Sequence, residues 1–83
     1  MAELSARFAR QAGEYREELL GADRAGDRTA VRDRAHKLAG IAPMLGHPDI
    51  GSAALELEEA IETQSDCRTA FARLDRLLAA ITG

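Results

Sequence analysis

With 83 residues, 46% of them hydrophobic and 30% charged, the chain has the composition of one globular domain, residues 1–83, near the lower size limit for a self-sufficient core. Its single cysteine excludes an internal disulfide, and a formal net charge of −3 with one Tyr, two Phe and no Trp argues against nucleic acid as a partner. No apolar run is long enough to cross a bilayer, so we expect a cytoplasmic protein that does not associate with membranes.

The first predicted helix begins at about Ala2 and ends near Gly26. Its apolar residues recur at helical spacing, at Leu4, Phe8, Ala12, Tyr15 and Leu19. Gly26 tolerates the left-handed turn that ends a helix, and Asp27 can accept hydrogen bonds from the first amides of the next one. The second helix is therefore predicted to start near Arg28.

The second helix carries an apolar stripe that ends where a Gly-His-Pro-Asp segment, residues 46–49, breaks the pattern. The stripe consists of Val31, Ala35, Leu38, Ala42 and Leu45. Pro43 lies within this predicted helix, although not on its stripe, and lacks the amide hydrogen that a helix interior needs. We expect Pro43 to kink this helix or to begin its end.

Two more amphipathic segments follow, separated by turn and capping residues at Ser65 and Asp66. The third stripe is Ile50, Ala53, Ala54, Leu57, Ala60 and Ile61, and the fourth is Cys67, Ala70, Phe71, Leu74, Leu77, Leu78 and Ile81. No segment alternates as a strand would. Four stripes with short connections predict an all-α fold, an antiparallel up-down-up-down four-helix bundle.

His36 and Gly40 lie one turn apart on the side of the second helix that faces away from its stripe. At 100° per residue they fall about 140° and about 180° from the centre of the stripe, so both should face solvent. A side chain at position 40 would lean back over the imidazole, whereas glycine leaves that space open, although it costs about 1 kcal/mol relative to alanine. We predict that Gly40 gives a reactive group of another macromolecule access to His36.

The neighbours of His36 include two cations that suit an anion on the ring. Arg32 lies one turn earlier and Lys37 is the next residue, so either could offset the charge of a phosphoryl group, although such a pair is also typical of a solvated face. A free imidazole has a pKa of about 6.5, so at neutral pH much of it is neutral and nucleophilic.

The other polar residues do not indicate a site. His47 and His36 without a cluster of carboxylates or thiolates make a poor metal site, and no metal is expected. The glutamates of the third helix are spread around it, which indicates solvated faces; they are Glu56, Glu58, Glu59 and Glu62. Cys67 is interpreted as a small buried residue.

The segment around His36 resembles the histidine-containing phosphotransfer (HPt) domains of two-component phosphorelays. The residues that match the family pattern are Ala35, His36, Leu38, Gly40, Ala42 and Gly46, and the Gly26-Asp27 turn and the later Leu57, Glu58 and Ala60 are also similar. The resemblance implies that His36 accepts a phosphoryl group from a phospho-aspartate on one receiver domain and passes it to another. It implies a carrier rather than an enzyme, with no ATP site or cofactor of its own.

The resemblance also implies the partners, which are response-regulator receiver domains and a hybrid sensor histidine kinase. Mg²⁺ is expected on the partner receiver, and the chain itself is expected to be a monomer. Pro43 lies about 20° from His36 around the helix, so Pro43 and Met44 are candidates for docking a receiver, with a simple bend at Pro43 as the alternative. Exposed Met44 or Ile41 could also mediate self-association.

Three positions depart from the family pattern. Ala39 stands where many members have lysine, Ile41 where a small serine is frequent, and Pro43 where a second helix glycine is frequent. Lys37 with Arg32 would then have to supply the positive charge. These departures leave a second hypothesis open: a non-catalytic helical adaptor, or a degenerate HPt domain that binds receivers without accepting phosphate.

Overall fold

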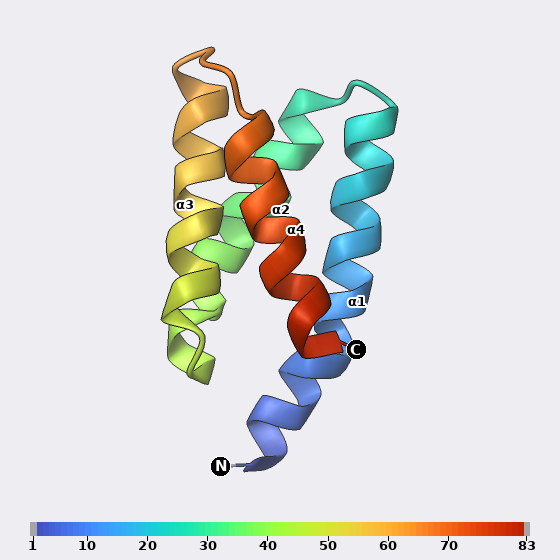
Figure 1. Cartoon of the computed structure of the whole chain (residues 1–83), viewed down its shortest axis with the longest axis vertical. Coiled ribbons are helices and arrows are strands. Elements are labelled where there is room, and N and C mark those ends of the chain that lie inside the picture. The colour runs from blue at the N-terminus through green and yellow to red at the C-terminus, as the bar shows by residue number, and fades with distance from the viewer. Residues whose placement is uncertain (1, 83) are drawn as a thin grey trace.

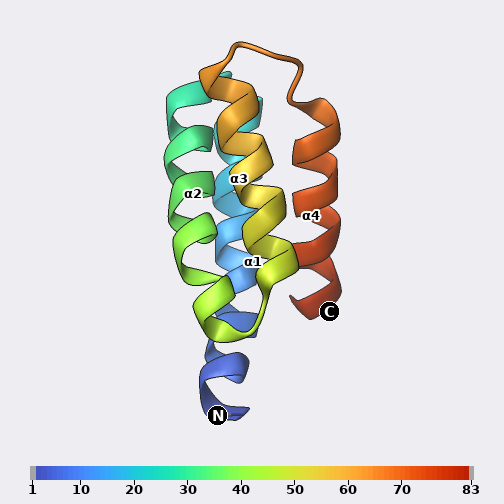
Figure 2. The same cartoon turned by 90° about the vertical axis from the view of Figure 1, so that its left-hand side faces the viewer.

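The computed structural model describes the backbone of residues 2–82 and the side chains of residues 7–82, and it contains four α-helices and one short 3₁₀ helix. These are α1 (Ala2–Arg24), α2 (Arg28–Ile41), η1 (Pro43–Leu45), α3 (Pro48–Glu62) and α4 (Arg68–Thr82). Successive helices run in opposite directions, and each packs against two others: α1 on α2 and α4, and α3 on α2 and α4 (Figures 1 and 2). The predicted antiparallel four-helix bundle is confirmed.

The turn between α1 and α2 forms as the sequence predicts. Gly26 adopts a φ of 70°, in the left-handed region where glycine avoids the steric penalty of a side chain. The Asp27 carboxylate accepts a hydrogen bond of 3.1 Å from the backbone N–H of Ala30, which caps the start of α2. A second cap precedes α4, where Arg68 donates to Asp66 and lowers the pKa of that carboxyl from 3.8 to about 2.

All four helices contribute to one core. The buried hydrophobic side chains are Phe8, Ala12, Leu19, Val31, Ala35, Leu38, Ala42, Ile50, Ala53, Ala54, Leu57, Leu74 and Leu78. Every one belongs to a predicted stripe. Other members of the stripes are only partly buried, and these are Tyr15, Leu45, Ala60, Ile61, Cys67, Ala70, Phe71, Leu77 and Ile81. Leu4, also predicted in the first stripe, lies outside the residues whose side chains are described. Among residues 2–82, no helix combines the length and the apolarity that a membrane span requires.

Pro43 follows the end of α2 and packs against α3. The helix stops at Ile41, and Pro43 opens η1 with its ring against buried Gly51. A Cβ atom added to Gly51 would lie 2.5 Å from Cγ and 2.7 Å from Cδ of Pro43, too close for real atoms. The proline therefore begins the end of the helix, as expected, and the glycine provides room for its ring.

Replacing Gly51 with alanine is expected to lower the free energy of unfolding by about 1–2 kcal/mol, because the new methyl group must displace the rigid proline ring. The matched change Gly40→Ala should instead raise it by up to about 1 kcal/mol, because nothing lies within 4 Å of a Cβ at that position. Denaturant unfolding of the two variants measures both values. Equal stabilities would contradict the contact between Pro43 and Gly51.

Candidate functional site

Three contacts define how α2 and α3 lie beside each other. Arg32 pairs with Glu62, His36 with Glu58, and Pro43 packs on Gly51. Each step along α2 is matched by an equal step back along α3, as expected for two antiparallel helices in register. The contacts therefore bring one row of α2 and one row of α3 together along a shared face.

His36 projects from this face into solvent while Glu58 holds one side of its ring. The His36 side chain is 75% exposed, and its Nδ1 lies 2.7 Å from Oε2 of Glu58, whose own side chain is only 13% exposed. A carboxylate accepts hydrogen bonds, so Nδ1 carries the proton and donates it. In the neutral ring, the other nitrogen, Nε2, then has the free lone pair, and the contact with Glu58 orients this nitrogen toward solvent as a nucleophile.

A shallow hollow of about 220 Å³ surrounds His36 and contains one cation and three acids. It is lined by Arg32, Asp33, His36, Glu58 and Glu62. The Arg32 guanidinium lies 3.4 Å from the carboxylate of Asp33 and 3.5 Å from that of Glu62. The structure thus places Arg32 beside the histidine, and its guanidinium contacts two acids there.

Lys37 lies on the other side of α2. Its Nζ is 6.0 Å from the centre of the Tyr15 ring, in a hollow that it shares with Glu14 and Glu18 between α1 and α2. Consecutive helical residues are separated by 100° around the axis, so a residue next to His36 in sequence need not lie next to it in space. Of the two predicted charge-supporting residues, the structure brings only Arg32 into the hollow of His36.

Beyond His36 along the chain, Gly40 and several apolar residues of η1 and α3 are exposed to solvent. Gly40 is exposed, with nothing within 4 Å of the place where a Cβ would be. Met44 is 83% exposed and Leu55 47% exposed, the two large hydrophobic residues most open to solvent in the described part of the chain. The register places Leu55, one turn before Glu58, beside this segment of α2, and Pro43 is also exposed. We call Gly40, Pro43, Met44 and Leu55 the apolar patch.

Glu58 and Leu55 are members of the site that the sequence analysis missed. The glutamates of α3 were interpreted as solvated faces, and for Glu58 this is wrong, because its carboxylate is largely buried against His36. A signal was present: Glu58 follows buried Ala54 by one turn and therefore adjoins the apolar stripe. The sequence pattern does not specify which neighbouring helix the edge of α3 that carries Glu58 would face.

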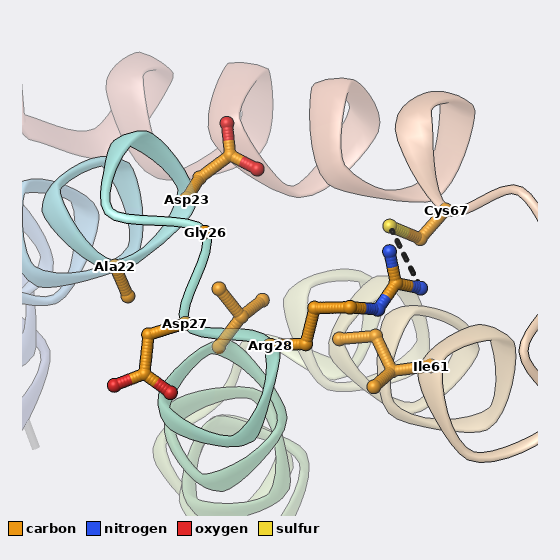
Figure 3. A pocket seen from close by; sticks show the side chains of 8 residues that line it. Ala22, Asp23, Gly26, Asp27, Arg28, Ile61 and Cys67 are labelled. Carbon is orange, nitrogen blue, oxygen red and sulfur yellow. Dashed lines mark hydrogen bonds between the residues drawn. The ribbon is translucent and has the colours of Figure 1, made fainter.

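A larger cavity lies at the end of the bundle where α2 and α4 begin. It measures about 260 Å³, and Figure 3 shows Arg28 and Cys67 pointing toward each other across it, with Nη2 of Arg28 4.0 Å from Sγ of Cys67. It shares no lining residue with the hollow of His36, which lies two turns further along α2. This cavity is therefore separate from the candidate site.

The second histidine is not part of the site either. His47 precedes α3 and its ring stacks on Phe8, with 5.0 Å between the ring centres. Within residues 2–82, no three His, Cys, Asp or Glu side chains are grouped so that they could hold a metal ion.

The comparisons with known proteins connect this geometry to a family. No curated protein and no solved structure matches the chain. The family model of the Hpt domain matches residues 3–83, which include all of the α2–α3 face. Hpt domains are phosphocarriers of phosphorelays and interact there with receiver domains and kinases. The chain, with its exposed histidine on a four-helix bundle, belongs to the Hpt domain family.

Proposed function

We propose that the chain is a histidine phosphotransfer protein that accepts a phosphoryl group on His36 from a receiver phospho-aspartate and passes it to the aspartate of another receiver. The observation that carries the proposal is the contact between His36 and Glu58. It combines an exposed ring with a fixed tautomer, in which Nδ1–H donates to a carboxylate 2.7 Å away and Nε2 is open to a partner.

In the proposed reaction, the lone pair of Nε2 forms a bond to phosphorus while the bond from phosphorus to the aspartate oxygen breaks. The electron pair of the broken bond leaves with the aspartate carboxylate, and the proton stays on Nδ1. The ring thereby gains a positive charge, which the carboxylate of Glu58 offsets through a charge-assisted hydrogen bond. Transfer to the next aspartate reverses these steps.

The remaining roles belong to the partner and to the face around His36. In this proposal the chain contributes no cofactor, and Mg²⁺ bound to the receiver would neutralise part of the charge on the phosphoryl group. Arg32 supports the charge on the side of the chain itself. The apolar patch beside His36 offers the receiver a hydrophobic contact, in which Met44 and Leu55 lose exposed surface on binding.

Replacing Glu58 with glutamine is expected to slow phosphoryl transfer about tenfold. The amide oxygen can still accept from Nδ1, but it carries no charge to stabilise the charged ring, and a charge-assisted hydrogen bond is roughly twice as strong as a neutral one. Rapid-quench kinetics with a phosphorylated receiver measures the rate. Glu56→Gln is the control, since Glu56 pairs with Arg73 on the opposite side of α3; equal rates for both variants would contradict the role of Glu58.

One observation favours the second hypothesis, an adaptor that binds receivers without accepting phosphate. Lys37 lies against Tyr15, so the lysine that was expected to replace the one missing at Ala39 does not reach His36. The two hypotheses differ in whether the chain itself becomes phosphorylated.

The experiment that tests the proposal incubates the chain with a receiver carrying labelled phospho-aspartate. A phosphotransfer protein acquires label that survives base and is lost in acid, as phosphohistidine does. An adaptor forms a complex with the receiver and remains unlabelled, and that result would overturn the proposed function.

A further inference from the structure

We infer that Glu62 controls how strongly the chain retains a phosphoryl group, because Glu62 and the phosphoryl group on His36 compete for the guanidinium of Arg32. This inference rests on the proposed function of His36. It assigns a role in the same site to an acid that the reaction itself does not use.

Arg32 lies next to His36 and is held there by two acids. It lies one turn before His36 on the same row of α2, and both residues line the same hollow. Its guanidinium is held from two sides, by Asp33 at 3.4 Å and by Glu62 of α3 at 3.5 Å. In the unphosphorylated protein, Arg32 is thus directed toward acids.

The ion pairs of Arg32 with Asp33 and Glu62 are weak. Both distances lie near the long end for ion pairs, and all three side chains are roughly half exposed to water. Exposed ion pairs of this kind contribute little, because solvent screens them and two long side chains must be ordered. A stronger anion within reach can therefore displace Glu62 and Asp33 from the guanidinium.

The hollow around His36 contains more negative than positive charge. Arg32 is the only cation among its five lining residues, and three carboxylates face it there: Asp33, Glu58 and Glu62. A phosphoryl group on Nε2 brings about two negative charges on its oxygens, which the positive charge of the ring offsets only in part. Arginine binds phosphate oxygens through two parallel hydrogen bonds, whereas Lys37 lies in the separate hollow beside Tyr15. Reorientation of Arg32 is the response that these five residues offer.

Glu62 therefore opposes retention of the phosphoryl group and favours its release. With Glu62 present, capture of Arg32 by the phosphoryl group requires an existing ion pair to break. Without Glu62, the guanidinium is freer to hold the phosphoryl group, so the phosphorylated chain becomes a poorer donor to the next receiver.

The test measures the equilibrium between phosphorylated chain and phosphorylated receiver for four proteins: wild type, Glu62→Gln, Arg32→Gln and the double variant. We expect Glu62→Gln to shift the equilibrium about two- to fivefold toward the phosphorylated chain, and Arg32→Gln to shift it about as far the other way. In the Arg32→Gln background the effect of Glu62→Gln should largely disappear, because there is no guanidinium left to compete for.

Glu59→Gln is the matched control, since Glu59 is an exposed acid of α3 that does not line the hollow. It removes the same charge and should leave the equilibrium unchanged. If Glu62→Gln acts no differently from Glu59→Gln, or acts equally with and without Arg32, the competition is refuted while the acceptor role of His36 stands. A wild-type chain that takes up no label refutes the proposed function itself.

Discussion

Replacing His36 with glutamine is expected to abolish phosphoryl acceptance by the chain. Glutamine has no nucleophilic ring nitrogen, and the loss of base-stable label should be complete rather than partial, because the other groups that line the hollow are carboxylates and one guanidinium, none of which can form phosphohistidine. The fold should be unaffected, since three quarters of the His36 side chain is exposed and surface substitutions rarely change stability by more than about 0.5 kcal/mol. Base-stable label on the protein, measured after incubation with a phosphorylated receiver, reports the result.

The chain offers a matched control, because it has two histidines. His47 stacks on Phe8 outside the hollow, so His47→Gln should retain label at the level of the wild type. Label on the His36 variant with none on the His47 variant would place the acceptor at the end of the bundle. Label on both would exclude either histidine as the sole acceptor.

Replacing Gly40 with leucine is expected to slow phosphoryl transfer about 10- to 100-fold while stabilising the protein. Helical side chains lean toward the N-terminus, so the leucine would lie over the turn that carries His36 and obstruct the partner. A displacement of reacting groups by about 1 Å can cost a factor of about 100 in rate. Stability should rise by about 0.5–1 kcal/mol, because leucine favours a helix more than glycine and nothing lies within 4 Å of the new Cβ.

Transfer kinetics and denaturant unfolding, measured on the same samples, separate the two effects. Gly40→Ala gives the intermediate case, with most of the helix stabilisation and little of the obstruction. A leucine variant that transfers phosphate at the wild-type rate would show that the open space above His36 has no part in access.

The sequence was sufficient for the features that depend on one helix at a time. The helix boundaries lie within about two residues of their predictions, because apolar periodicity and the caps at Gly26 and Asp27 are local signals. The exception is the end of α2 at Ile41, four residues before the end of the predicted stripe at Leu45. The exposure of Gly40 follows from the helical wheel in the same way. Features that depend on two helices were not accessible, since a wheel does not specify how its neighbour is rotated or shifted along the axis.

Three residues illustrate that limit. The sequence indicates a solvated Glu58. The contact with His36 depends on how α3 is rotated relative to α2, and the sequence of α3 alone does not specify this rotation. The wheel of α2 separates Lys37 from His36 by 100°, but only the packing of α1 on α2 determines that Lys37 meets Tyr15. The role of Pro43 depends on Gly51, eight residues later and on another helix, and no feature of α2 alone could reveal it.

The hydrogen bond between Nδ1 of His36 and Glu58 also has a consequence for the order of events in a relay. It leaves a single nitrogen open, so the donor and the recipient of the phosphoryl group must approach the same atom from the same side. The two receivers then exclude each other and bind in turn, as in a ping-pong scheme. A large excess of the unphosphorylated recipient would occupy the shared face and slow the uptake of phosphoryl groups from the donor. The rate of transfer from donor to recipient would therefore be highest at an intermediate ratio of the two partners.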